Sequence, residues 1–307
     1  MQSMTHMNDI EIANVNGAVS PAHHAFIPVS DHGFLYGDSV YETVRTYGRR
    51  PFLMAAHLDR LVRSAAAIRL PLPWSRERLV REVEATIAAA RGPGEVALRI
   101  IATRGAGPMG YDPDLCPSPN LVILLRRLTA AGPADQDRGI SAIVSTIRRN
   151  PIESLDPRIK SSNLLNNILA AQQAKDAGAD EALLFNSAGD LAEGTLTNIF
   201  FVGGGELRTP SIECGLLSGV TRELVLDLAR GDGIPCREGR FRREDLAVAD
   251  EVLLTSTTRE ILAVTSLDGR PIGSGRRGPV TARLQELFYG AVERFLKDGG
   301  GGGGCPE

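Results

Sequence analysis

Segments with strand-like and helix-like patterns follow one another along this chain, and many of the connections between them are of hairpin length. Residues 38–54 predict two strands around a turn at Gly48, because polar and apolar residues roughly alternate there. Residues 55–70 place apolar residues at helical spacing, and the Pro-Leu-Pro that follows ends this helix. This mixture predicts an α+β fold made of two α/β domains.

The rest of the chain continues the mixture. Ser75 is a residue type that favours the N-cap, and it starts a predicted helix that ends near Arg91. We predict strands at 96–104, 120–128 and 140–147, two within 181–202 and two within 249–269, and helices at 162–177, 218–230 and 281–297. The run 129–139 is small and polar and contains Gly and Pro, which is typical of a linker. We therefore expect a small N-terminal domain at 1–130, a linker at 131–139, a large C-terminal domain at 140–298 and a flexible Gly-rich tail at 299–307.

Composition excludes several classes of protein. A hydrophobic content of 43% with 23% charged residues is typical of a globular chain, and a net charge of −3 offers no basic face for nucleic acid. The four cysteines are scattered and form no CxxC pair, so neither a disulfide framework nor a structural zinc site is expected. No apolar run approaches the roughly 20 residues that span a bilayer, and no signal peptide is visible, so we expect a cytoplasmic protein without a membrane partner.

Lysine is rare in this chain, in which nearly all positive charges are arginines. Only Lys160, Lys175 and Lys297 are present, and the last two lie on the polar sides of predicted helices. A lysine that attacks a carbonyl must lose its proton, which requires desolvation or a neighbouring positive charge. Ile159, with Leu164 and Leu165, would supply apolar surroundings, and Arg158 would supply charge. Lys160 is therefore a candidate nucleophile.

Two segments have the form of anion sites. Ser218 and Gly219 precede a predicted helix whose first amides, at Val220 and Thr221, have no partner within the helix. An ordinary Ser cap explains this segment equally well. Residues 255–258 place four consecutive hydroxyl side chains at the end of an apolar strand, which suits a phosphate or a carboxylate but also an ordinary Ser/Thr-rich turn.

Two single charges stand out as well. Arg60 lies on an otherwise apolar helix, where it is either exposed or paired, and Glu193 lies at a strand end beside Gly194. A lone carboxylate at that place is either a surface residue or the partner of a protonated ring nitrogen.

Two apparent motifs lack the context that their chemistry needs. Residues 105–110 match GxGxxG, but Pro108, Gly110 and Pro113 prevent the helix that a dinucleotide-binding motif requires, so we expect a flexible loop that covers a site. His23 and His24 are adjacent and lack acidic or Cys partners at ligand spacing, so no metal is expected.

Taken in order, six motifs resemble those of the fold-type IV pyridoxal-phosphate enzymes, the family of branched-chain and D-amino-acid aminotransferases. The resemblance runs from about Ile12 to Leu296. The motifs are DHGFLYGDSVYETVRTY, HLDRLVRSA, RIKSSNLLNN, EGTLTNIF, LLSGVTREL and TSTTREI. The series as a whole is far more specific than any one of its members.

The resemblance implies a site and a cofactor, pyridoxal 5'-phosphate. Lys160 would bind the cofactor and shuttle the substrate's proton, and Glu193 would keep the pyridinium nitrogen protonated. The implied phosphate ligands are Arg60, Val220, Thr221 and Thr257. The implied substrate contacts are Tyr36, Arg45, Arg104, Ser256 and Thr258. The family is generally dimeric, so a homodimer or higher homo-oligomer is expected.

The choice of substrate stays open at this point. Arg45 resembles the arginine with which branched-chain enzymes accept the side-chain carboxylate of glutamate, whereas Thr43, Leu164 and Ala97 depart from that group's pattern. Arg104 matches arginines of both branched-chain and D-amino-acid enzymes. We expect a transaminase of branched-chain type that acts on amino acids and 2-oxo acids such as 2-oxoglutarate. The alternatives are a D-amino-acid transaminase, an aminodeoxychorismate lyase and, against the full set of catalytic groups, a pyridoxal-phosphate-binding protein without turnover.

Overall fold

A computed structural model describes residues 10–128 and 138–298. The predicted tail at 299–307 and all but the last two residues of the predicted linker at 131–139 lie outside these ranges. The described chain divides into two compact units: residues 10–128, 159–163 and Asp298 form the first, and residues 138–158 and 164–297 form the second. The α+β fold predicted from the sequence is confirmed.

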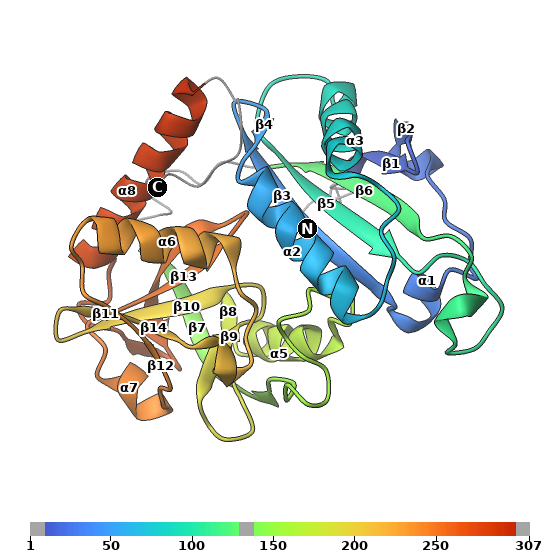
Figure 1. Cartoon of the computed structure of the whole chain (residues 1–307). Coiled ribbons are helices and arrows are strands. Elements are labelled where there is room, and N and C mark those ends of the chain that lie inside the picture. Colours follow the sequence, from blue (N-terminus) through green and yellow to red (C-terminus); the bar gives the residue numbers. More distant parts are fainter. Residues whose placement is uncertain (1–9, 129–137, 299–307) are drawn as a thin grey trace, which may run out of the picture. The chain divides into compact units, whose positions relative to one another are not determined.

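The described part of the first unit forms a six-stranded antiparallel sheet with the order β2-β1-β6-β5-β3-β4 (Figure 1). The strands are β1 (Ile10–Val15), β2 (Ala18–Pro21), β3 (Ser39–Tyr47), β4 (Arg50–Pro51), β5 (Val96–Thr103) and β6 (Asn120–Arg127), and the helices are α1 (His32–Tyr36), α2 (Met54–Ala67) and α3 (Arg76–Ala89), with 3-10 turns at Ala22–His24 and Pro113–Leu115. Helices α2 and α3 cover one face of the sheet, and their apolar sides form one core with residues of the strands. This core includes Val40 of β3, Leu61 of α2 and Trp74 between the two helices.

The described part of the second unit forms a nine-stranded mixed sheet with the order β12-β11-β10-β13-β14-β7-β8-β9, and β15 pairs with β14. Its strands are β7 (Ile140–Arg148), β8 (Glu181–Phe185), β9 (Leu191–Gly194), β10 (Asn198–Gly203), β11 (Glu206–Pro210), β12 (Cys236–Gly239), β13 (Glu251–Ser256), β14 (Glu260–Leu267) and β15 (Arg270–Pro271), and its helices are α5 (Leu165–Asp176), α6 (Val220–Gly231), α7 (Arg243–Ala247) and α8 (Pro279–Lys297), with a 3-10 turn at Ile212–Cys214. Helix α5 packs on β7 and β8, while α6 and α8 pack on each other and on β13 (Figure 1).

Residues 159–163 differ from the prediction, which placed them in a domain at 140–298. They pack against β3 in the first unit, where Ser162 donates its amide proton to the Ser39 carbonyl over 3.1 Å and Ser161 bridges Val40. The helix predicted at 162–177 begins only at Leu165, because Ser161 and Ser162 before it pair with the extended strand β3. The domain boundaries at 130 and 140 stay a proposal.

The loop at 105–110 contains no helix, which agrees with rejecting a dinucleotide-binding motif there. Gly105 has a φ of 99°, and a Cβ at this position would lie 1.8 Å from the Ser118 carbonyl oxygen. Close packing of the loop, and not the approach of a phosphate, explains this glycine.

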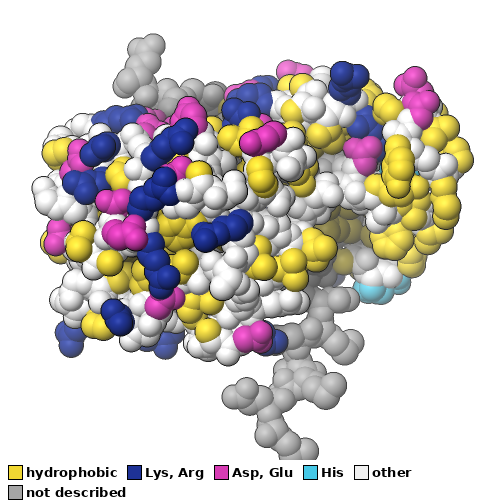
Figure 2. All heavy atoms as spheres, turned by 90° about the horizontal axis from the view of Figure 1, so that it is seen from below, with side chains coloured by type: hydrophobic (Ala, Val, Ile, Leu, Met, Phe, Trp, Pro, Cys, Tyr) yellow, Lys and Arg dark blue, Asp and Glu magenta, His cyan; other side chains and the backbone are white. Residues whose placement is uncertain are grey.

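Part of the first unit's surface is strongly apolar. Figure 2 shows hydrophobic side chains gathered at the right of the view, the side on which α1 lies in Figure 1. The large exposed side chains around α1 and the 105–116 loop are Phe26, Val29, Phe34, Met109 and Tyr111, with exposed fractions from 68% to 90%. Large exposed apolar patches are typical of surfaces that contact another protein or a ligand.

Neither a membrane span nor a metal cluster occurs in the described ranges. Among residues 10–128 and 138–298 no helix combines the length and apolarity needed to cross a membrane. Within the same ranges no group of three or more His, Cys, Asp or Glu side chains is arranged to hold a metal ion.

Candidate active site

Lys160 is fixed within the first unit by its main chain. Its amide donates to the Ser64 hydroxyl of α2 over 3.1 Å, and its carbonyl accepts from the Tyr41 amide of β3 over 2.9 Å. The side-chain nitrogen Nζ lies 4.7 Å from the centre of the Tyr41 ring. The contacts with helix α2 and strand β3 thus fix the backbone of Lys160, from which the side-chain amine extends.

The surroundings of Lys160 match the prediction only in part. Ile159 packs against the core of the first unit, as expected. Leu165 is 67% exposed, so it does not shield the amine. Arg158 donates from Nε and Nη2 to Asp156, which compensates the charge that we expected beside the lysine.

Arg60 is buried and paired in the first unit. Its Nε and Nη2 atoms donate to the two carboxylate oxygens of Glu42 over 2.7 and 2.8 Å. His57, one helical turn earlier on α2, contacts the same carboxylate through Nδ1 over 2.8 Å. A bidentate pair with an additional ring contact fixes the plane of the Arg60 guanidinium.

The charges in this cluster are well defined. Burial alone would raise the pKa of Glu42, but Arg60, together with the hydrogen bond to His57, outweighs burial and lowers that pKa to about 2. Burial lowers the pKa of His57 more strongly than the Glu42 carboxylate raises it. His57 is therefore neutral, and because the carboxylate only accepts, Nδ1 carries the ring proton.

Sequence reasoning identified Arg60 and did not identify Glu42 or His57. A signal was present, because His57 and Arg60 are three residues apart and share one face of a helix. The position of Glu42 on the facing strand followed only from the tertiary packing of α2 on β3.

One face of β3 and β5 carries two arginines, each stacked on a tyrosine. The Arg45 guanidinium carbon lies 4.2 Å from the centre of the Tyr47 ring, and that of Arg99 lies 3.7 Å from the centre of the Tyr41 ring. Arg99 pairs in register with Thr43, so it projects on the same side of the sheet as Tyr41 and Arg45. Arg45 was predicted as a substrate contact, whereas Arg99 was not.

Arg104, a predicted substrate contact, is held by several groups of the first unit. It is 5% exposed, donates from Nε and Nη2 to Asp38, and also donates to the carbonyls of Arg69 and Ile68. These contacts use nearly all of its donors, so Arg104 ties β5 to the end of α2 and has little capacity left for a substrate carboxylate.

Tyr36, another predicted substrate contact, lies at the end of α1. Its hydroxyl accepts from the Gly110 amide over 3.3 Å, and its ring centre lies 5.3 Å from that of Tyr111. These contacts place Tyr36 beside the 105–116 loop.

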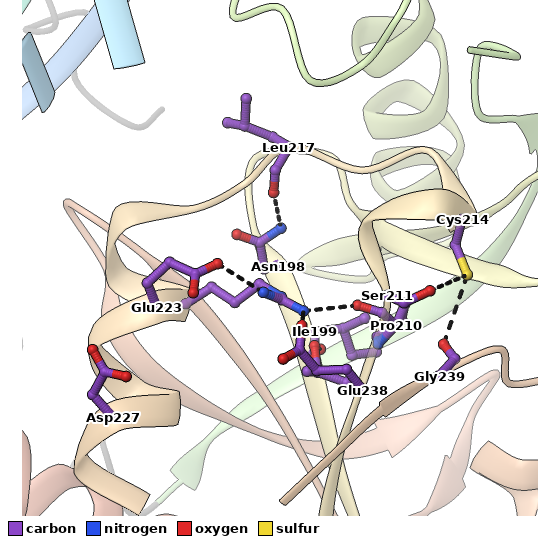
Figure 3. Close-up of polar contacts among 12 residues, drawn as sticks. Asn198, Ile199, Pro210, Ser211, Cys214, Leu217, Glu223, Asp227, Glu238 and Gly239 are labelled. Carbon is purple, nitrogen blue, oxygen red and sulfur yellow. Dashed lines mark hydrogen bonds and ion pairs between the residues drawn. The ribbon is translucent and has the colours of Figure 1, made fainter. Parts of the chain in front are cut away.

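Glu193 is a buried carboxylate of the second unit. The Nε atom of Arg149 donates to Oε1 over 2.7 Å, and the Leu217 amide donates to Oε2 over 3.0 Å. The Asn198 side chain approaches the same Oε2 and donates to the Leu217 carbonyl over 2.9 Å, a contact drawn in Figure 3. Glu193 is thus paired with a cation and oriented, and it was not predicted that Arg149, which is 44 residues away in the sequence, would be its partner.

Helix α6 begins at Val220 without a side-chain cap. Its N-cap residue is Gly219, so the ordinary Ser cap, the alternative to an anion site in this segment, is not the arrangement found. A Cβ at Gly219 would lie 1.9 Å from Asn198 Oδ1, which explains the glycine. The amides of Val220 and Thr221 lack intrahelical acceptors and sit at the positive end of the helix dipole, which favours an anion there.

Behind this helix end lies a buried arginine. Arg222 is 1% exposed and donates to Glu223, Glu238 and the Pro210 carbonyl, as Figure 3 shows around the labelled acceptors. A cation near a helix N-terminus is unfavourable unless it is paired, and these two carboxylates compensate it.

The last residue of β13, Ser256, and the turn that follows it carry the remaining predicted residues, Ser256, Thr257 and Thr258. The Arg259 amide donates to the Ser256 hydroxyl over 3.2 Å, which closes the turn. Thr255, just before it, has a buried hydroxyl without a hydrogen-bond partner among the described residues. The second unit therefore offers a charge-paired carboxylate, a helix N-terminus and a hydroxyl-rich turn, and the first unit offers an amine and several guanidinium groups.

The chain matches known proteins over most of its length. Residues 39–267 match the family model described as amino-transferase class IV. A putative branched-chain-amino-acid aminotransferase from Methanocaldococcus jannaschii is 37% identical over 274 residues, covering 89% of this chain and 94% of that protein. A D-alanine aminotransferase from Listeria monocytogenes is 35% identical over 283 residues, covering 91% of this chain and 96% of that protein.

Solved structures agree. The T.th. branched-chain amino acid aminotransferase with pyridoxamine 5'-phosphate has a TM-score of 0.85 and 32% identity, with 92% of this chain and 94% of that chain covered. The same enzyme complexed with N-(5'-phosphopyridoxyl)-L-glutamate gives the same values.

Proposed function

Because the chain belongs to the class IV aminotransferases and is a pyridoxal-phosphate-dependent transaminase, we propose that it transfers amino groups between a branched-chain L-amino acid and a dicarboxylic 2-oxo acid such as 2-oxoglutarate. The proposal of a dicarboxylic acceptor is supported by the two stacked arginines, Arg45 and Arg99, on one face of β3 and β5. Guanidinium groups bind carboxylates through paired hydrogen bonds, and stacking on tyrosine keeps their planes fixed.

The donor set fits the cofactor. Pyridoxal phosphate, when bound, supplies an aldehyde that accepts an amine and a ring that withdraws electrons from the substrate's α-carbon. Lys160 has the amine for the aldehyde and for moving the α-proton. Glu193, which Arg149 pairs and aligns, has the carboxylate that keeps a ring nitrogen protonated.

The phosphate requires donors and positive charge. We assign it to the unpaired amides at the start of α6, to Arg60 and to Thr257, and we assign the substrate carboxylate to the turn at 256–258. The uncapped Gly219 supports the first of these assignments, since a side chain at that position would collide with Asn198. Substrate contacts from Tyr36 and Arg45 complete the proposal.

A D-amino-acid transaminase is the second candidate. The D-alanine aminotransferase relative, at 35% identity over 91% of this chain, favours it. The contacts of Arg104 with Asp38 and two carbonyls do not separate the two candidates, because this arginine matches arginines of both groups.

We also propose a cytoplasmic homodimer. The apolar surface formed by Phe26, Val29, Phe34, Met109 and Tyr111 supports self-association, because exposed aromatic side chains of this density are typical of interfaces. The three described cysteines, Cys116, Cys214 and Cys236, are free thiols, which suits a reducing compartment.

A half-reaction tests the substrate. The purified protein, loaded with pyridoxal phosphate, is mixed with L-leucine or with D-alanine in the absence of an acceptor. We expect L-leucine to bleach the absorbance band of the lysine-bound cofactor and 2-oxoglutarate to restore it. Bleaching by D-alanine alone would move the assignment to the D-specific group. A Lys160→Ala protein that retains full activity would contradict the entire scheme.

A further inference from the structure

Glu181 is a buried carboxylate outside the predicted site. It begins β8, is 2% exposed and lies in the second unit. Its Oε1 atom accepts from the Thr195 amide over 3.0 Å and also from the Thr195 hydroxyl. Its Oε2 atom accepts from Arg259 Nη1 over 3.2 Å and, more weakly, from the Thr197 hydroxyl over 3.5 Å.

The partners of Glu181 come from two separate turns. Thr195 and Thr197 closely follow Glu193, the proposed partner of the ring nitrogen. Arg259 is the last residue of the turn after β13 and directly follows residues 256–258, which we assign to phosphate and substrate carboxylate. One carboxylate therefore joins the two segments of the second unit that carry most of its proposed site.

The packing around Glu181 leaves little freedom. A Cβ at Gly194 would lie 2.2 Å from the Thr197 hydroxyl and 3.4 Å from the Glu181 carboxyl carbon, so this turn closes directly on the carboxylate. Asn167 of α5 holds the same turn by donating to the Thr195 carbonyl over 2.7 Å. A displacement of the carboxylate would thus move the residues next to Glu193.

Arg259 compensates the charge of the buried Glu181 carboxylate. A carboxylate charge at this depth is costly unless it is paired, and Arg259 is its cationic partner among the described residues. The Arg259 side chain is 40% exposed, so its guanidinium reaches inward from the surface and anchors the end of a turn to the body of the sheet.

We infer that the Glu181–Arg259 pair is a positioning device that sets the 256–258 turn relative to Glu193, and so sets the affinity for cofactor phosphate and substrate carboxylate without touching either. This inference rests on the proposed roles of Thr257, Ser256 and Thr258. It deepens that proposal by naming what orients those residues.

The test compares Arg259→Ala with Arg243→Ala. The control also removes an exposed arginine of the second unit from an ion pair, that with Asp268 at 2.7 Å, but on α7 and away from the two turns. For each protein the Kd of pyridoxal phosphate is measured by absorbance titration of the apo form, and KM and kcat are measured with the holoenzyme.

We expect Arg259→Ala to raise the Kd of pyridoxal phosphate and the KM for both substrates by about tenfold, with kcat within about threefold of the wild type. Arg259→Lys should recover part of the loss because it keeps the charge, and Glu181→Gln should shift both constants in the same direction. Arg243→Ala should match the wild type.

Three outcomes would overturn the inference. Constants for Arg259→Ala equal to those of Arg243→Ala would remove the positioning role and leave the transaminase assignment intact. A rise in KM confined to the dicarboxylic acceptor, with an unchanged cofactor Kd, would indicate direct contact between Arg259 and that substrate. A wild-type protein that does not bind pyridoxal phosphate would overturn the proposed function together with this inference.

Discussion

We propose that Arg60 binds the cofactor phosphate, and its guanidinium is already held by Glu42. Glu42 takes the Nε and Nη2 donors, and His57 holds the carboxylate from the other side. The plane of the guanidinium is thereby fixed before any ligand arrives. Preorganisation of this kind lowers the entropy that binding costs.

Replacing Glu42 by Gln tests this arrangement. We expect Glu42→Gln to lower the free energy of unfolding of the first unit by about 3 kcal/mol, because it leaves Arg60 buried without a counter-charge. The single tryptophan, Trp74, lies in the core of this unit, so its fluorescence in urea reports the change. Glu11→Gln, which breaks the partly exposed pair with Arg127 in the same unit, should cost less than about 1 kcal/mol. Equal losses would refute a special role for Glu42.

Arg45 has a testable substrate preference. We expect Arg45→Ala to raise the KM for the dicarboxylic acceptor 2-oxoglutarate by about tenfold and to change kcat/KM for leucine by less than about twofold, because only the dicarboxylate has a second charge to bind. Steady-state kinetics with each substrate varied separately provide the measurement. A matching loss for leucine would show that Arg45 supports the site in general and does not select the dicarboxylate.

At the residue scale, the sequence identified side chains of unusual type or position but did not identify the residues that pair with them. Lys160 stood out because lysine is rare here, and Glu193 because it lies beside Gly194 at a strand end. Glu42, Arg99 and Arg149 are ordinary in type and become significant only through packing of distant segments, whereas the spacing of His57 from Arg60 was a local signal that we did not use. The same reason explains Arg104, whose contact with Asp38 across 66 residues no local pattern indicated.

At the element scale, the start of α6 depends on a missing side chain. Gly219→Ala places a Cβ 1.9 Å from Asn198 Oδ1, and the same Asn198 side chain donates to the Leu217 carbonyl. We expect this substitution to raise the Kd of pyridoxal phosphate by about tenfold, because the amides of Val220 and Thr221 must move. Absorbance titration of the apo protein measures it.

The same helix supplies the control. Gly231 closes α6, and a Cβ at that position meets no atom within 4 Å, so Gly231→Ala should leave the Kd unchanged and should stabilise slightly through helix propensity. If both substitutions shift the Kd alike, the N-terminus of α6 is not the phosphate site.

Periodicity predicted the amphipathic helices, because each buries one regular face, and short apolar runs predicted strands such as β8 and β13, which are buried on both faces. Helix α3 begins after Ser75, whose hydroxyl accepts from the Arg78 amide, and β3 and β4 turn at Gly48 as expected. The prediction was wrong at residues 162–164, because Ser162 donates to β3, Asn163 donates from its side chain to the Gly37 carbonyl, and Leu164 is only the N-cap of α5. Only long-range strand contacts, which periodicity does not contain, decide such a boundary.

At the scale of the whole molecule, the apolar surface near α1 predicts association. We expect the wild type to elute as a dimer in size-exclusion chromatography and Phe34→Ser with Val29→Ser to shift the population toward monomer, since both side chains are more than half exposed in one chain. Val248→Ser, which alters a side chain that is 79% exposed in the second unit, is the control. A wild type that elutes as a monomer would remove the proposed dimer.

Acid should destabilise the folded chain in two stages. The pKa of His57 is lowered on folding, so below about pH 6.5 the unfolded state takes up a proton that the folded state refuses, and the free energy of unfolding falls. The pKa of Glu42 is about 2 when folded, against an ordinary 4.5, so its contribution is lost as the pH falls from about 4.5 toward 2.

Urea unfolding followed by Trp74 fluorescence at about pH 7.5, 6 and 5 isolates the first stage, because Glu42 stays charged over that range. We expect His57→Asn to be less stable than the wild type near neutral pH and to lose less stability as the pH falls to about 5. Parallel curves for the two proteins would show that other groups cause the loss in this range.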